Sequence, residues 1–68
     1  MKHTLYIKEG CYFCAVMKQS LEELGLDFEI KDSTSGAAPK LVLNNEVIFV
    51  GLPHYKKLIE YVNDYTNN

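Results

Sequence analysis

The sequence lacks any apolar run near the length of about 20 residues that a membrane-spanning helix requires. It also lacks internal repeats and interdomain linkers, so we expect a single domain over residues 1–68. The formal net charge is only -2, which gives no electrostatic basis for binding nucleic acid or an anionic membrane. The amino-terminal residues contain no long apolar segment of the secretory type, and we therefore expect a cytoplasmic protein.

Cysteine is represented only by Cys11 and Cys14, which stand three residues apart. A structural zinc site needs about four nitrogen or sulfur ligands. His3 and His54 are the only other candidates of that kind, and the spacing places neither beside the cysteines, so we expect no mononuclear metal site. In a reducing compartment an isolated cysteine pair is more often catalytic or metal-binding than a structural crosslink. We interpret the pair as redox-active. The alternative is that both cysteines are inert thiols in the core.

The first half of the chain predicts a strand, a helix and a strand. Apolar and polar residues alternate over residues 4–8 and 27–31, which is the pattern of half-buried strands. Between them, apolar residues at helical spacing predict a helix from Cys11 to about Leu24. Gly25 suits the left-handed conformation in which many helices end. The two strands of such a unit are expected to be parallel.

The second half predicts a hairpin. Small and polar residues predict a loop over residues 33–38, and strands are expected at 40–43 and 47–50. Asn44 and Asn45 lie between these strands, and asparagine tolerates the positive φ angles of a tight hairpin turn.

A last helix follows the hairpin. Pro53 suits the first position of that helix. Its expected inward stripe consists of Tyr55, Leu58, Val62 and Tyr65. The whole chain is therefore predicted to be an α/β domain of order β-α-β-β-β-α, with a four-stranded mixed sheet and two helices.

The two cysteines are expected in unequal surroundings at the first strand–helix junction. Cys14 begins the inward stripe of the helix, so its sulfur should be shielded. Cys11 precedes the stripe at the helix N-terminus, where free backbone N–H groups and the helix dipole favour a thiolate. Residues three apart on a helix are also close enough to form a disulfide. Cys11 is therefore predicted to attack a substrate disulfide, and Cys14 to resolve the resulting mixed disulfide.

Several motifs in this order resemble the glutaredoxins and glutaredoxin-like redoxins of the thioredoxin-fold superfamily. They are the Cys-x-x-Cys pair at the first junction, Pro39 before the third strand, the hairpin, and Gly51 before the last helix. The resemblance covers residues 4–62 and implies a minimal thioredoxin fold. The helix that the family places between its second and third strands is missing, because only residues 33–38 remain there.

The resemblance also implies a substrate-binding surface. Its expected members are Lys8, Tyr12, Phe13, Ala38, Pro39, Gly51 and Leu52. Pro39 would be cis and lie beside the dithiol, and Ala38 would offer its backbone to an extended thiol peptide. Tyr12 replaces the family's usual proline between the cysteines. Leu52 stands where the family usually has an acidic or hydroxyl residue that grips glutathione.

The implied function is that of an enzyme, a thiol–disulfide oxidoreductase that reduces protein or glutathione mixed disulfides. Glutathione or thioredoxin reductase would donate the electrons, and ribonucleotide reductase is one candidate protein substrate. No tightly bound cofactor is implied. Two alternatives remain open, namely a dimer that binds an iron–sulfur cluster through Cys11 of each chain and glutathione, and a redox-gated interaction module.

The missing helix would leave one face of the sheet bare. Val42, Ile48 and Val50 would join that face if the hairpin register allows it. We therefore expect either a monomer with a partly hydrated sheet or a weak homodimer.

Overall fold

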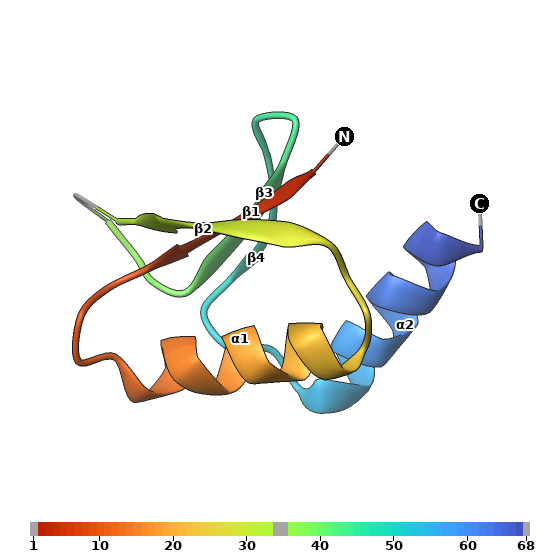
Figure 1. The fold of residues 1–68 in the computed structure, drawn as a ribbon, viewed down its shortest axis with the longest axis horizontal. Helices are drawn as coiled ribbons and strands as arrows, with labels where there is room; N and C mark the ends of the chain where they lie inside the picture. The colour runs from red at the N-terminus through yellow and green to blue at the C-terminus, as the bar shows by residue number, and fades with distance from the viewer. Residues whose placement is uncertain (1, 34–35, 68) are drawn as a thin grey trace.

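The computed structural model describes residues 2–33 and 36–67. Its elements are β1 (His3–Ile7), α1 (Tyr12–Glu23), β2 (Phe28–Asp32), β3 (Lys40–Leu43), β4 (Glu46–Val50) and α2 (Tyr55–Thr66) (Figure 1). The α/β class and the order β-α-β-β-β-α are as predicted. Thr34 and Ser35 of the expected loop lie outside the described residues. Each described helix has 12 residues, and neither is long and apolar enough to cross a membrane.

The four strands form one mixed sheet in the order β2-β1-β3-β4. β1 pairs with β2 in parallel, and β3 pairs antiparallel with both β1 and β4. The two helices lie on the same side of this sheet (Figure 1). β1 begins one residue earlier than predicted, and β2 begins one residue later. The pairing register explains both differences. His3 pairs with Phe28 and Ile7 with Asp32, so the two strands begin and end together.

Helix α1 ends as the sequence predicts. Gly25 has a φ angle of +81°, and its N–H donates to the carbonyl oxygen of Glu22 at 3.1 Å. The N–H of Leu26 donates to the carbonyl oxygen of Leu21, also at 3.1 Å. These two bonds form a Schellman motif, which satisfies carbonyl groups that the helix leaves without internal partners.

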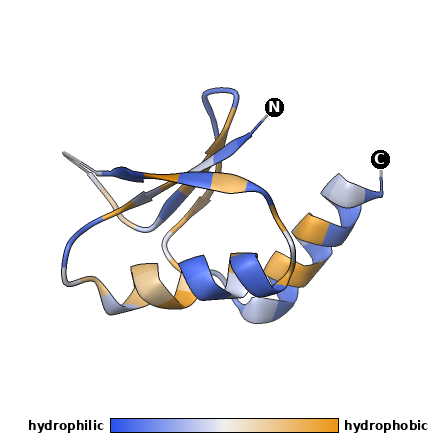
Figure 2. Cartoon of the chain, viewed as in Figure 1, coloured by the Kyte–Doolittle hydropathy of each residue, from blue (hydrophilic) through white to orange (hydrophobic). Residues whose placement is uncertain are grey.

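The hairpin turn also follows its sequence. Asn44 and Asn45 have φ angles of 55° and 66°, and Leu43 pairs with Glu46 on either side of them. Two successive positive φ angles match the twist of a two-residue hairpin turn of type I′. The turn is hydrophilic, as expected for its exposed position (Figure 2).

The start of α2 differs from the prediction. The helix begins at Tyr55, and Pro53 is not its first residue. His54 is the N-cap, because its Nδ1 accepts a hydrogen bond from the backbone N–H of Lys56 at 3.2 Å. The imidazole thus satisfies a backbone donor of the first turn, and Pro53 lies in the connection before the cap.

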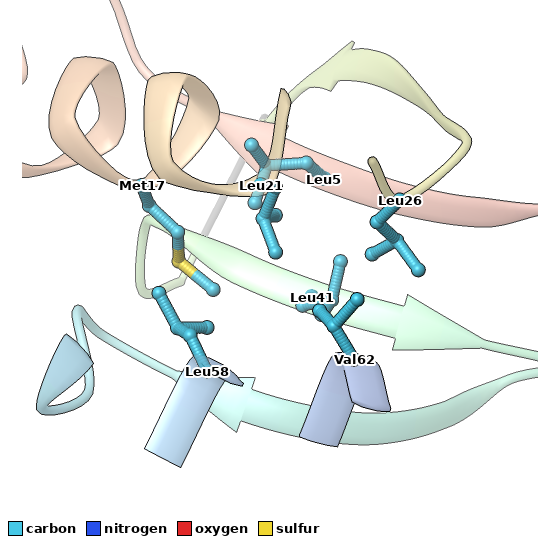
Figure 3. Close-up of a cluster of buried hydrophobic side chains, with 7 residues drawn as sticks. All are labelled: Leu5, Met17, Leu21, Leu26, Leu41, Leu58 and Val62. Atoms are coloured by element: carbon cyan, nitrogen blue, oxygen red, sulfur yellow. The ribbon is translucent and has the colours of Figure 1, made fainter. Parts of the chain in front are cut away.

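A single cluster of buried apolar side chains lies between the sheet and the helices (Figure 3). It consists of Leu5, Met17, Leu21, Leu26, Leu41, Leu58 and Val62. The expected stripe of α2 is therefore buried only in its middle. Tyr55 is 47% exposed and Tyr65 is 38% exposed, because the two ends of α2 extend past the packed centre.

The sheet face opposite the helices is bare in the described structure. Tyr6 pairs with Lys40 and Lys40 pairs with Val50, which places all three on this face, since Leu5 points into the core. A register shift in the β3–β4 ladder pairs Val42 with Val47. Val47 therefore joins the bare face, whereas Ile48 packs against the core, contrary to the expectation for Ile48.

Candidate functional site

The connection between β1 and α1 holds Cys11 at the N-terminus of the helix. Gly10 turns the chain with a φ angle of +76°, and the N–H of Cys11 donates to the carbonyl oxygen of Lys8 at 3.3 Å. Cys11 has extended backbone angles and is the N-cap of α1. Its Sγ accepts a hydrogen bond from the backbone N–H of Cys14 at 3.1 Å. The sulfur thus occupies the position that a serine or aspartate oxygen takes in most capped helices.

Cys11 and Cys14 form a disulfide, with their Cα atoms 5.2 Å apart. This separation lies within the range of about 4.4–6.8 Å that disulfides accept. Cys14 is 3% exposed, whereas Cys11 is half-buried. The predicted difference in shielding between the two sulfurs is therefore confirmed. An incoming group reaches the Cys11 side of the bond more easily than the Cys14 side.

Two aromatic rings project into solvent between the cysteines. Tyr12 is 75% exposed and Phe13 is 58% exposed. Their ring centroids are 5.8 Å apart, with an edge-to-face angle of 65°. Exposed rings of this size beside the disulfide offer apolar contact area to another molecule.

A groove of about 430 Å³ borders the disulfide on the side of the β1–α1 connection. Both cysteines line it, together with Lys8 and Tyr12 from the predicted site. Lys18 also lines this groove, although no motif in the sequence marks it. Its position four residues after Cys14 is the signal that was available, because residues at that spacing share one face of a helix.

The remaining predicted residues form a second group. The peptide bond between Ala38 and Pro39 is cis, as the sequence resemblance implies, and Pro39 is buried. The N–H of Gly51 donates to the carbonyl oxygen of Pro39 at 2.7 Å, which joins the two segments. Leu52, beside Gly51, packs against the core.

The two groups lie at the same end of the sheet. Tyr6, near the end of β1, pairs with Lys40, and Lys40 pairs with Val50. The start of β3 therefore lies beside the end of β1 that leads to Cys11, and the end of β4 lies beyond it at the same end of the sheet (Figure 1). Ala38, Pro39, Gly51 and Leu52 do not line the groove that contains the cysteines. Phe13 is also absent from its lining, since the ring projects outward.

The groove carries charges of both signs. Lys8 and Lys18 bring positive charge, and Glu9 brings negative charge. The ammonium group of Lys18 lies 3.9 Å from a carboxylate oxygen of Glu22, with both side chains largely exposed. Exposed pairs of this kind contribute little to stability, about 0–1 kcal/mol, so Lys18 can exchange partners easily. Within residues 2–33 and 36–67, no group of three or more His, Cys, Asp or Glu side chains is arranged to hold a metal ion.

Comparison of the chain with protein-family models, with curated proteins and with solved structures finds no significant match in any of the three. A Cys-x-x-Cys disulfide with one shielded and one accessible sulfur is compatible with thiol–disulfide exchange.

Proposed function

We propose that this protein is a glutaredoxin-like thiol–disulfide oxidoreductase built on a minimal thioredoxin fold. The observation that carries the proposal is the position of Cys11, whose sulfur caps α1 and accepts the N–H of Cys14 at 3.1 Å. When the disulfide is reduced, the same N–H and the positive end of the helix dipole stabilise a thiolate on Cys11. Sites of this kind lower thiol pKa values from about 8.5 to roughly 3.5–7.5.

The reaction starts from the reduced dithiol. The Cys11 thiolate attacks one sulfur of a substrate disulfide, so that a bond from Cys11 to the substrate forms while the substrate's own S–S bond breaks. The departing substrate sulfur leaves as a thiolate and takes up a proton. Cys14 then loses its proton and attacks the sulfur of Cys11, which releases the second substrate thiolate. The protein is left with its own disulfide, and two electrons have passed to the substrate.

A separate donor must return the two electrons. Two glutathione molecules would supply them as two thiols, and thioredoxin reductase would supply them as one dithiol. Lys8 and Tyr12 line the groove beside the sulfurs, and Phe13 lies on the outer side. In this proposal they contact the bound substrate, together with the backbone of Ala38 and the segment around Pro39, Gly51 and Leu52.

The direct test is disulfide reduction coupled to NADPH oxidation, with glutathione plus its reductase in one arm and thioredoxin reductase in the other. We expect turnover in at least one arm, and its loss in Cys11→Ser. Gln19→Ala, an exposed change on the same helix, is the control and should keep full activity. Absence of turnover in both arms would contradict the proposal and favour an interaction module. Visible absorbance in anaerobically purified protein would instead favour the iron–sulfur alternative.

A further inference from the structure

His3, the first residue of β1, has an imidazole ring that is fully buried. Its Nε2 lies 2.6 Å from the hydroxyl oxygen of Tyr61, a hydrogen-bond distance. Its Nδ1 is also buried and has no hydrogen-bond partner in the described structure. Buried polar atoms without partners are rare in folded proteins, so this nitrogen requires a physical explanation.

The ring connects the sheet to the last half of α2. It meets the ring of Tyr65 edge-on, with centroids 4.6 Å apart, and the ring of Tyr61 edge-on at 5.6 Å. Tyr61 in turn contacts Phe49 of β4, with centroids 5.7 Å apart. These four aromatic residues, which we call the His3 cluster, hold α2 against β1 and β4.

The charged and titratable groups near this imidazole come from several elements. From α2, the phenol groups of Tyr61 and Tyr65 face it. On the β4 side, Glu46 acts electrostatically on Tyr61. Beside β2, Asp27 pairs with Lys2 at 3.7 Å and is largely exposed. On its own strand, His3 follows Lys2 and the positively charged amino terminus. None of these described groups is a carboxylate bonded to His3, and burial lowers the pKa of His3 below its ordinary value of 6.5, assisted by the amino-terminal charge.

We propose that His3 is an acid-sensitive latch, and that protonation of its imidazole releases the C-terminal half of α2 from the sheet. The neutral ring carries one N–H donor and one acceptor nitrogen; Nε2 is paired with Tyr61, and Nδ1 is left as an unpaired but uncharged polar atom. The protonated ring carries two N–H donors, and the donor on Nδ1 would face a buried site without an acceptor. Exposing the ring to water removes both the unpaired donor and the buried charge. Because α2 carries two members of the His3 cluster, its movement is the simplest route to that exposure.

The direction of the pH effect follows from proton linkage. The released state, in which His3 is hydrated, binds a proton near pH 6.5, whereas the latched state binds it only at lower pH. Docking of α2 is therefore at full strength above about pH 6.5 and weakens as the pH falls. Within that window, the ratio of released to latched molecules rises about tenfold for each pH unit, until the pKa of the latched state is reached.

The latch is separate from the proposed dithiol chemistry. His3 begins β1, and the cysteines follow the other end of that strand. Its test therefore does not require disulfide exchange to occur, and either inference can fail without the other.

The experiment follows both histidine rings by NMR while the pH is lowered from 8 to 4, and it records amide hydrogen exchange in α2 and α1. We expect the His3 ring to titrate below pH 6.5, because burial lowers its pKa. We also expect the exchange rates of residues 61–66, corrected for intrinsic pH dependence, to rise about tenfold per pH unit below 6.5. Amides in the middle of α1 should change less.

Two variants separate the latch from general acid unfolding. His3→Phe keeps an aromatic ring that cannot be protonated, so its α2 exchange rates should be the same at pH 7.5 and pH 5. His54→Asn keeps a capping side chain and should behave like the wild type. An equal acid response in His3→Phe would overturn the proposal. If that variant does not fold, the wild-type titration decides: a His3 pKa at or above the ordinary value of 6.5, with unchanged α2 protection, would also overturn it.

Discussion

Cys11 illustrates how one atom can serve both structure and chemistry. Its Sγ accepts the backbone N–H of Cys14 as the N-cap of α1 and also forms half of the disulfide. A neutral serine hydroxyl could provide the cap, but it would not exchange disulfides. This predicts that Cys11→Ser preserves the helix, as measured by circular dichroism, while removing the proposed disulfide exchange.

The aromatic partner of His3 gives a prediction at high pH. Burial raises the pKa of Tyr61 above its ordinary value of 10.0, and the charges of Tyr65 and Glu46 raise it further. The folded protein thus holds this phenol protonated longer than the unfolded chain does. The stability that results is present below about pH 10 and is lost as the pH rises further. An absorbance titration at alkaline pH should show one phenol that ionises later than the others, and this step should be absent in Tyr61→Phe. Identical titration curves for the wild type and Tyr61→Phe in the late part of the titration would contradict the assignment.

Helix α1 depends on how its last turn is closed. Gly25 adopts a φ angle of +81°, a conformation in which a side chain is strained whatever space surrounds it. Gly25→Ala should therefore lower the free energy of unfolding by about 1 kcal/mol, even though an added Cβ would meet no atom within 4 Å. Urea denaturation measures the change, with Gln19→Ala as a neutral control on the same helix. An unchanged midpoint would show that a side chain is tolerated at this φ angle without cost.

The elements also show which features can be read from the sequence. Gly25, Asn44 and Asn45 were predictable, because each residue type has a strong local preference for positive φ. The first residue of α2 was not predictable. Proline is common at the first position of a helix, which favours Pro53, but the helix begins after the capping bond of His54. Capping by an imidazole depends on the side-chain rotamer, which a residue pattern does not specify.

The hairpin face was predicted only in part for a similar reason. Val42 and Val50 lie on the bare face as expected if the register allows, but the register shift moves Val47 onto it and Ile48 into the core contacts. A bulge changes the side-chain alternation without leaving a residue type that marks it. In the candidate site, the cysteines and the cis proline were predictable from motifs, whereas the position of Lys18 depends on three-dimensional packing. The buried His3–Tyr61 bond, which lies outside that site, depends on packing in the same way.

On the scale of the whole molecule, one small cluster must support the fold. A chain of 68 residues buries a limited core, and Leu21 lies fully within it. Leu21→Ala should lower the free energy of unfolding by about 2–5 kcal/mol, which is a large share of the stability of a small domain. Val50→Ala, on the bare face where Val50 is 62% exposed, should change stability by less than about 0.5 kcal/mol. Equal losses in the two variants, measured by urea denaturation, would mean that the bare face is buried in solution.

The bare face also bears on the oligomeric state. Val47 and Val50 are exposed there, beside Lys40, whose ammonium lies 5.2 Å from the centre of the Tyr6 ring. The expected choice between a monomer and a weak homodimer stays a prediction. Sedimentation at micromolar concentration distinguishes the two, and a single monomeric species would remove self-association through this face.

The proposed roles of the two sulfurs are attack by Cys11 and resolution by Cys14. Trapping the mixed disulfide tests them most directly. Reduced Cys14→Ser and reduced Cys11→Ser would each be mixed with glutathione disulfide and analysed by intact-protein mass spectrometry after a short reaction at neutral pH. We predict that Cys14→Ser gains one glutathione on Cys11, since no second thiol can resolve the bond. Cys11→Ser should gain almost none in the same time, because Cys14 is shielded. Faster adduct formation on Cys14 than on Cys11 would contradict the proposed mechanism.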